Sequence, residues 1–230
     1  MLQLEGLSIR QGGFHLTADW SVPKGARVAV IGPSGAGKST LLMALAGFVS
    51  HDGRILWEGK DLAPLPPGDR PLSILFQDQN LFPHLTVTQN VGLGLSPRLR
   101  LTPADLSKID ATLERVGLSG MGGRKPGQLS GGQIGRAALA RALLRARPIL
   151  LLDEPFAALG PALKAEMLDL VAETAEQSGA TVLMVTHDPA DALRFADLAV
   201  LVADGVASPP QPTAALLADP PPALRAYLGR

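Results

Sequence analysis

Several short runs of the sequence are apolar at nearly every position, without the alternation of a half-exposed strand. They are Arg27–Ile31, Ile149–Leu152, Thr181–Val185 and Leu198–Ala203. Strands buried on both faces of a parallel sheet have this uniform pattern, because helices cover both sides. The runs therefore predict an α/β fold with a parallel sheet.

The first residues follow another pattern. Leu2–Glu5, Leu7–Arg10 and Phe14–Trp20 alternate apolar and polar positions, and glycines separate the segments. This alternation is typical of antiparallel strands with one buried face. We predict an antiparallel β part over 1–26, packed on a core formed by 27–79 and 147–207.

The stretch from 80 to 146 contains no buried-strand pattern, and helix signals dominate it. Thr102 is a suitable N-cap and Pro103 suits a first helical turn. One apolar face follows at helical spacing, with Leu106, Ile109, Leu113 and Val116. These signals predict a helical subdomain inserted into a single domain of 1–230.

The C-terminal segment 208–230 is rich in proline. Proline lacks the backbone N–H that helices and sheets require. We expect no regular element over 208–222, and one closing helical turn over 223–228.

Composition narrows the function classes. Lys plus Arg and Asp plus Glu are equal at 21 each, so no long-range basic field gathers nucleic acid, and no nucleic-acid partner is expected. The absence of cysteine excludes disulfides, thiolate metal sites and a cysteine nucleophile. The N-terminus lacks signal-peptide features, and the apolar runs are shorter than the ~18 residues of a membrane span. We expect a cytosolic chain whose membrane association depends on a partner.

A glycine-rich segment between a predicted strand and a predicted helix matches the phosphate-binding P-loop pattern G-x-x-x-x-G-K-[ST]. Its residues are Gly32, Pro33, Ser34, Gly35, Ala36, Gly37, Lys38, Ser39 and Thr40. Backbone N–H groups and the helix N-terminus suit the β- and γ-phosphates of ATP, Lys38 supplies a cation, and Ser39 is a ligand for Mg²⁺. The alternative, an ordinary glycine-rich turn, does not explain the flanking strand and helix.

Two carboxylates, Asp153 and Glu154, follow the apolar run Ile149–Leu152. Parallel strands present such residues at the carboxyl edge of the sheet, beside the P-loop. Neighbouring side chains on a strand point in different directions, so Asp153 can hold Mg²⁺ while Glu154 acts as general base toward water. This is the pattern of a Walker B strand.

Other candidates follow predicted strands or begin a helix. Gln77 offers an amide to Mg²⁺ or water, and His187 offers an imidazole to a phosphate oxygen or the attacking water. A helix N-terminus with N–H groups that suit a phosphate is formed by Ser130, Gly131, Gly132 and Gln133. Each feature alone is common in structural roles, and only their combination indicates a site.

Leu129–Gln133 is the signature pentapeptide of the ATP-binding cassette (ABC) ATPases, and here the sequence resembles that family. The P-loop, Gln77, the signature, Asp153-Glu154 and His187 occur in the family's order. The resemblance implies a P-loop NTPase with a RecA-like parallel core, in which Lys38, Gln77, Glu154 and His187 are catalytic. It also implies an ATP-sandwich homodimer, in which a second copy supplies the signature.

A single cassette resembles the ATPase subunits of bacterial importers. Residues 77–95 resemble those of importers generally. Gln89–Pro97, Gly32–Gly37 and the short length are most similar to those of thiamine importers, which implies uptake of thiamine or its phosphates. The implied partners are transmembrane permease subunits and, indirectly, a periplasmic or extracellular solute-binding protein. The chain would be peripheral, on the cytoplasmic face of the inner membrane. We expect Leu81, Phe82 and Leu85 to be exposed and to form the permease groove, although Phe82 could instead belong to the helical core.

The sequence departs from the family pattern at three places. In the family, an aromatic residue upstream of the P-loop stacks on adenine, and Gln11 occupies that position here. Phe14 or the guanidinium of Arg10 could take over the stacking role. Ile134-Gly135 follows the signature in place of polar residues, and Gly160 replaces an aspartate that links the two half-sites.

Other functions remain open on the sequence. These are an importer ATPase for another solute, a soluble ABC ATPase acting on nucleic acid or ribosomes, and a nucleotide switch without hydrolysis. The zero net charge argues against the second, and Glu154 argues against the third.

Overall fold

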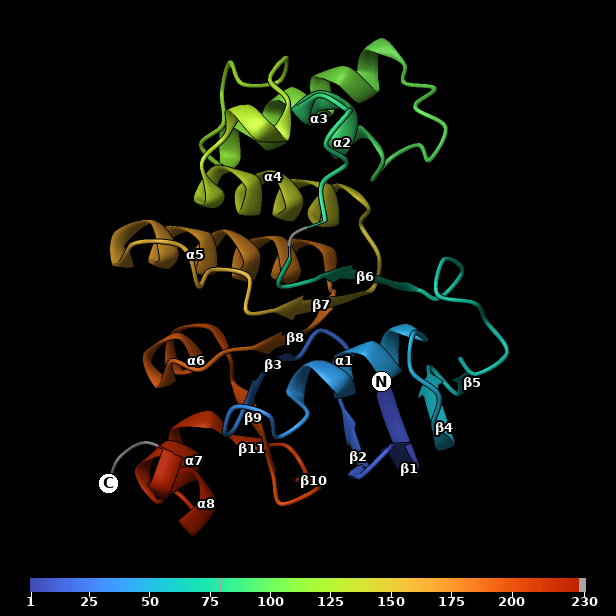
Figure 1. Cartoon of the computed structure of the whole chain (residues 1–230), viewed down its shortest axis with the longest axis vertical. Coiled ribbons are helices and arrows are strands. Elements are labelled where there is room, and N and C mark those ends of the chain that lie inside the picture. The colour runs from blue at the N-terminus through green and yellow to red at the C-terminus, as the bar shows by residue number, and fades with distance from the viewer. Residues whose placement is uncertain (79, 228–230) are drawn as a thin grey trace.

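A twisted sheet runs through the centre of the molecule (Figure 1). Its parallel part has the order β9, β3, β8, β7, β6, which are Leu198–Ala203, Arg27–Ile31, Thr181–Val185, Ile149–Asp153 and Leu72–Leu75. The register sets Val28 opposite both Leu183 and Leu198, so β3 is paired on both sides. The computed structural model describes residues 1–78 and 80–227. The predicted parallel strands are confirmed.

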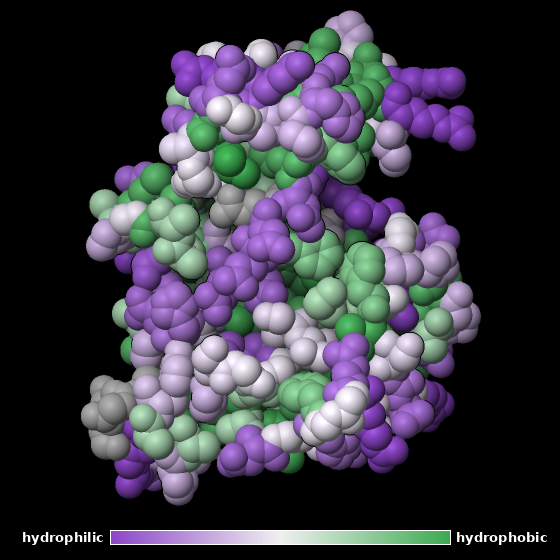
Figure 2. Space-filling model, in the orientation of Figure 1, coloured by the Kyte–Doolittle hydropathy of each residue, from purple (hydrophilic) through white to green (hydrophobic). Residues whose placement is uncertain are grey.

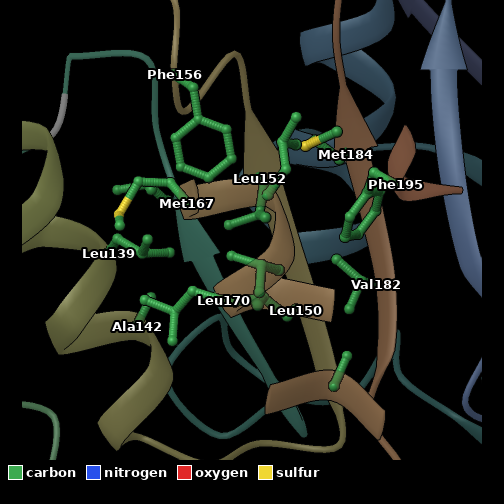
Figure 3. Packing of buried hydrophobic residues seen from close by; sticks show 14 of the residues in the cluster. Leu139, Ala142, Leu150, Leu152, Phe156, Met167, Leu170, Val182, Met184 and Phe195 are labelled. Atoms are coloured by element: carbon green, nitrogen blue, oxygen red, sulfur yellow. The ribbon is translucent and has the colours of Figure 1, made fainter. Parts of the chain in front are cut away.

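Successive residues of these strands enter different hydrophobic clusters. Along β7, Ile149 and Leu151 belong to the cluster beneath α1 (Lys38–Ala46), whereas Leu150 and Leu152 belong to the cluster beneath the other helices. The strands are therefore buried on both faces, which explains their uniformly apolar sequence. Figure 3 shows the second cluster, in which Leu150, Leu152, Val182 and Met184 meet Leu139, Ala142, Phe156, Met167, Leu170 and Phe195.

The antiparallel part contains β1 (Leu2–Gln11) and β2 (Phe14–Val22), as predicted, and also β4 (Asp52–Trp57) and β5 (Lys60–Asp61). Strand β4 pairs with β1. The expected division, with 1–26 antiparallel and 27–79 in the core, is therefore wrong for 52–61. The cause is tertiary, because β4 finds its partner in a strand that precedes the P-loop. The short β10 (Val206–Ala207) joins the two parts by pairing with β2 and β9.

A helical part stands at the β6 edge of the sheet (Figure 1). It contains α2 (Val87–Gly92), α3 (Pro103–Arg115), a 3₁₀ turn at Pro126–Gln128 and α4 (Gly131–Leu144). The Thr102 hydroxyl accepts from the Asp105 N–H, and the Asp105 carboxylate accepts from the Thr102 N–H. This capping box and the N1 proline fix the start of α3 where the sequence predicts it.

The C-terminal segment is more regular than expected. Strand β11 (Gln211–Pro212) pairs with β9, and α7 (Thr213–Ala218) and α8 (Pro222–Tyr227) follow. The prediction of no regular element over 208–222 is wrong, because the prolines lie at the borders and leave an Ala- and Leu-rich segment between them. The predicted closing turn corresponds to α8; Leu228 lies outside the described residues.

The remaining helices, α5 (Pro161–Ser178) and α6 (Pro189–Phe195), cover the sheet face opposite α1. Within 1–78 and 80–227, none of the helices has the length and apolar character needed to cross a bilayer.

Candidate nucleotide site

The P-loop connects the end of β3 to the start of α1, and its glycines are required by close approaches. A Cβ added to Gly32 would lie 2.0 Å from the Val202 carbonyl oxygen on β9. Gly37 has φ of 101°, and a Cβ there would lie 2.4 Å from Cζ of Phe14. The loop therefore fits closely between β9 and the ring of Phe14.

Lys38 folds back over the loop. Its Nζ donates to the carbonyls of Gly32 at 2.9 Å and Pro33 at 2.8 Å, and the residue is 7% exposed. Burial lowers the pKa of Lys38, and the negative charges of Glu154 and Asp153 oppose this shift. The ammonium thus keeps the loop in shape while facing two carboxylates.

Asp153, at the end of β7, accepts a hydrogen bond from the Ser39 hydroxyl at 3.0 Å. The pKa of Asp153 is raised, mainly by burial and further by Glu154, while the Ser39 hydrogen bond and Lys38 oppose the rise. A bound cation would offset the free-energy cost of burying the charged carboxylate. A buried carboxylate beside a hydroxyl is an oxygen ligand set that suits Mg²⁺.

Glu154 occupies a left-handed backbone conformation, with φ of 46°, directly after the strand. Its N–H donates to the Val185 carbonyl at 3.2 Å, so the neighbouring strand fixes the turn. Its Oε2 lies 3.3 Å from Nδ1 of His187, whose side chain is 59% exposed. The pair thus brings a carboxylate and an imidazole together at the carboxyl edge of the sheet.

These residues surround a cavity of about 510 Å³. Its lining consists of Phe14, Ser34, Gly35, Gly37, Lys38, Ser39, Thr40, Gln77, Glu154, His187 and Tyr227. The structure thus brings together the predicted residues of the P-loop, Gln77, Glu154 and His187. Gly32, Pro33, Ala36 and Asp153 are not among the described lining residues; the first three belong to the same loop, and Asp153 accepts from the Ser39 hydroxyl.

Two lining residues bear on the sequence predictions. Phe14 lines the cavity, whereas Gln11 and Arg10 are not among its described lining residues. Of the substitutes considered for the missing aromatic residue, Phe14 is thus the one placed at the site. Tyr227 was missed, because no motif marks it; its one sequence signal is that it is the chain's single tyrosine.

The signature lies elsewhere. The Ser130 hydroxyl accepts from the Gln133 N–H at 3.3 Å, and Oε1 of Gln133 accepts from the Ser130 N–H at 2.9 Å, which caps α4. Ser130 and Gly131 are exposed, and Gly132 packs toward Leu159. Within one chain, the structure does not bring the signature to the cavity.

The two other positions that depart from the family pattern, Gly135 and Gly160, both lie in or next to helices. Gly135 is buried within α4. Gly160 is the N-cap of α5, with φ of −68° and no side chain to cap the helix.

A groove of about 800 Å³ lies between the helical part and the segments that lead into β6 and β7, at a notch visible in Figure 2. Phe82 lines it and is 48% exposed, whereas Leu81 packs against the core and Leu85 is half-buried. The expectation that all three are exposed is wrong for the leucines, and the exposed ring argues against a core role for Phe82.

Asn90 holds this loop from within. It is fully buried; its Oδ1 accepts from the Phe82 N–H at 2.7 Å, and its Nδ2 donates to the carbonyls of Phe82, Leu85 and Thr86. A single buried amide therefore fixes the backbone that presents Phe82 to the groove.

The fold and the cavity define a P-loop ATPase. One edge of the sheet carries a phosphate-binding loop, a carboxylate suited to bind a metal ion (Asp153) and a carboxylate–imidazole pair (Glu154 and His187). The chain belongs to the ABC transporter family, whose characteristic domain matches residues 16–157. It is an ATP hydrolase of that family, and the resemblance drawn from the signature is confirmed.

Relatives match over the whole length. The Thiamine import ATP-binding protein ThiQ of Cereibacter sphaeroides is 71% identical over 230 residues, covering 100% of both chains. The protein of the same name from Ruegeria sp. is 60% identical over 100% of both chains. The one from Shigella flexneri is 53% identical over 89% of each.

Solved structures agree with the fold. A dimeric structure of the ATP-binding cassette MJ0796, in a post-hydrolysis state bound to ADP and Pi, has a TM-score of 0.83 at 29% identity. It covers 93% of this chain and 99% of that one. The predicted P-loop α/β fold class is confirmed.

Proposed function

We propose that the chain is the ATP-hydrolysing subunit of an importer for thiamine or its phosphates, and that it drives a separate transmembrane permease. The observation that carries this proposal is the 71% identity, over the full length of both chains, to a thiamine import ATP-binding protein. The cavity with its P-loop, carboxylates and imidazole supports the ATPase part independently.

In the proposed site, the P-loop N–H groups and Lys38 bind the ATP phosphates, and Phe14 lies where adenine could stack. Ser39, Asp153 and Gln77 would hold Mg²⁺, which supplies charge neutralisation at the phosphate oxygens when bound. Lys38 would exchange its contacts with the loop carbonyls for contacts with phosphate.

Glu154 and His187 carry the proposed hydrolytic chemistry. Glu154 orients the attacking water and accepts its proton, while His187 donates a hydrogen bond to the γ-phosphate. The water oxygen forms the new bond to phosphorus, and the bond to the bridging oxygen of ADP breaks. The 3.3 Å approach of Nδ1 to Oε2 supports a shared task for the two groups.

A second copy of the chain is the proposed source of the signature. Ser130, Gly131, Gly132 and Gln133 lie away from the cavity of their own chain, so a head-to-tail dimer could place their helix N-terminus against a nucleotide bound to the other copy. The dimeric form of MJ0796 supports this arrangement.

The groove beside Phe82 is the proposed permease contact. It is a recess of about 800 Å³ between two parts of the fold, with the exposed Phe82 ring on one side and Arg145 and Arg147 on another. An apolar ring on a fixed loop suits the insertion of a helix from a partner. The chain would then be peripheral on the cytoplasmic face of the inner membrane, with a solute-binding protein acting on the far side.

The test is uptake in cells that lack their own thiamine importer and express this chain with the permease and binding protein of its genomic neighbourhood. We expect ATP-dependent uptake of labelled thiamine or thiamine monophosphate, lost in Lys38→Ala. Uptake of another solute in the same cells would instead indicate a different importer. Copurification with no membrane protein would favour a soluble ABC ATPase, and no phosphate release from ATP would favour a switch.

A further inference from the structure

The C-terminal helix α8 reaches back to the nucleotide site. Leu224, in the middle of the helix, is 0% exposed and belongs to the hydrophobic cluster on the sheet face opposite α1. Tyr227, one turn later, lines the cavity. Its hydroxyl donates to the backbone carbonyl of His187 at 2.9 Å, across 40 residues of sequence.

That contact completes the support of one peptide unit. The carbonyl of His187 accepts from Tyr227, and the N–H of Asp188, in the same peptide, donates to the Thr186 hydroxyl at 3.1 Å. A peptide unit is planar, so hydrogen bonds at both ends fix its orientation. The direction in which the imidazole of His187 leaves the backbone depends on that orientation.

The residues on either side are held separately. The carboxylate of Asp188 caps α6 through the Ala190 N–H and pairs with Lys164 at 2.6 Å. The Thr186 N–H donates to the Val30 carbonyl at 3.2 Å, which ties the segment to β3. The bond from Tyr227 therefore acts on the histidine between two fixed residues.

The chemistry of the hydroxyl suits a permanent donor. The pKa of Tyr227 is raised, mainly by burial and further by the negative charges of Glu154 and Asp188. The group therefore stays protonated throughout the physiological range.

We propose that Tyr227 is a positioning residue for ATP hydrolysis, which holds the peptide of His187 so that the imidazole faces Glu154 and the cavity. The proposal rests on the catalytic role proposed above for His187. It makes α8 part of the active-site support rather than a passive end of the chain.

The first test is Tyr227→Phe, which keeps the ring and removes the hydroxyl. We expect kcat to fall about three- to tenfold, as for one lost hydrogen bond, while the KM for ATP and the thermal melt stay near wild type. Arg225→Ala, on the same helix, removes an exposed pair with Asp219 and should leave kcat unchanged. A kcat of Tyr227→Phe equal to wild type, or a fall in kcat that matches a loss of thermal stability, would overturn the proposal.

His187→Ala separates this inference from the proposed function. If it leaves kcat at the wild-type level, the role of His187 is wrong and the positioning role is refuted with it. If it lowers kcat strongly while Tyr227→Phe does not, His187 keeps its role and only the inference about Tyr227 is refuted.

The single tyrosine allows a second readout. Growth with 3-fluorotyrosine labels this position alone, gives one ¹⁹F resonance and makes the phenol more acidic. We expect the labelled enzyme to lose kcat at a lower pH than the unlabelled enzyme, in step with the shift of that resonance. Identical pH profiles for the two enzymes, despite a titrating resonance, would contradict the proposal.

Discussion

Phe82 offers the sharpest test of the proposed permease groove, through the substitution Phe82→Asp. The ring is 48% exposed, so about half of its apolar surface is buried in the isolated chain. Full burial of a phenylalanine contributes about 1.5–3 kcal/mol, and loss of half of it corresponds to about 1 kcal/mol. In a domain of this size, that lowers Tm by about 2–4 °C.

The effect on partner binding should be far larger. A carboxylate in place of the ring has to lose its hydration when a partner helix covers it, which costs several kcal/mol unless Arg145 or Arg147, on another side of the groove, compensates its charge. We therefore expect the variant to melt almost like wild type and to hydrolyse ATP at the wild-type rate when isolated. It should no longer copurify with the tagged permease in detergent, and thiamine uptake should be lost.

Two matched variants make the assay interpretable. Leu106→Asp changes another exposed apolar side chain of the helical part, 42% exposed and not among the described residues of the groove, and should keep permease binding. Ile109→Asp places a charge at a fully buried position of α3 and should lower Tm sharply. A melt of Phe82→Asp that resembles that of Ile109→Asp, or copurification equal to that of Leu106→Asp, would refute the docking role.

Three further substitutions test the site and its support. Glu154→Gln should keep ATP binding, form a stable dimer in ATP and stop turnover, because the amide keeps the shape of the side chain and cannot act as the base. A rate of phosphate release within about threefold of wild type, which corresponds to a change of less than about 1 kcal/mol in the activation barrier, would contradict that role. Asp153→Asn should raise Tm without Mg²⁺ at neutral pH. The pKa of Asp153 is raised above the ordinary 3.8, so the folded protein loses stability as pH rises through that raised pKa, and the neutral amide removes this loss. The gain should vanish as pH falls toward 3.8, and a lower Tm for Asp153→Asn at pH 7 would contradict this reasoning. Arg70→Met should lower the urea midpoint by the equivalent of about 2–4 kcal/mol, because the buried guanidinium donates to the Ala44 and Leu45 carbonyls at the end of α1. An unchanged midpoint would show that these hydrogen bonds contribute little to stability.

The fold could be predicted where local chemistry and tertiary structure agree. Uniformly apolar runs identified β3, β7, β8 and β9, because burial on both faces leaves no polar position. Thr102 and Pro103 located the start of α3 for a similarly local reason. Strand β4 was assigned to the wrong part because its pairing with β1 depends on where the chain goes after α1, which no local pattern records.

The site divides in the same way. Residues 32–40, Asp153 and Glu154 are recognisable because phosphate and metal binding require fixed residue types at fixed spacing. Phe14 could be named only as one of two substitutes for the missing aromatic residue, and Tyr227 was missed, because each reaches the cavity from a segment whose position is set by packing. The burial of Leu81 likewise depends on contacts with the core that a short apolar cluster does not reveal.

The position of β3 between β8 and β9 has a consequence for folding during synthesis on the ribosome. Arg27–Ile31 emerges early, yet both of its hydrogen-bonding neighbours, Thr181–Val185 and Leu198–Ala203, are synthesised near the end. The strand that leads into the P-loop therefore has unpaired edges for most of translation, when exposed apolar strands favour aggregation. Nascent chains that stop before β9 should fail to retain ATP, so nucleotide binding marks a chain whose synthesis has passed this strand.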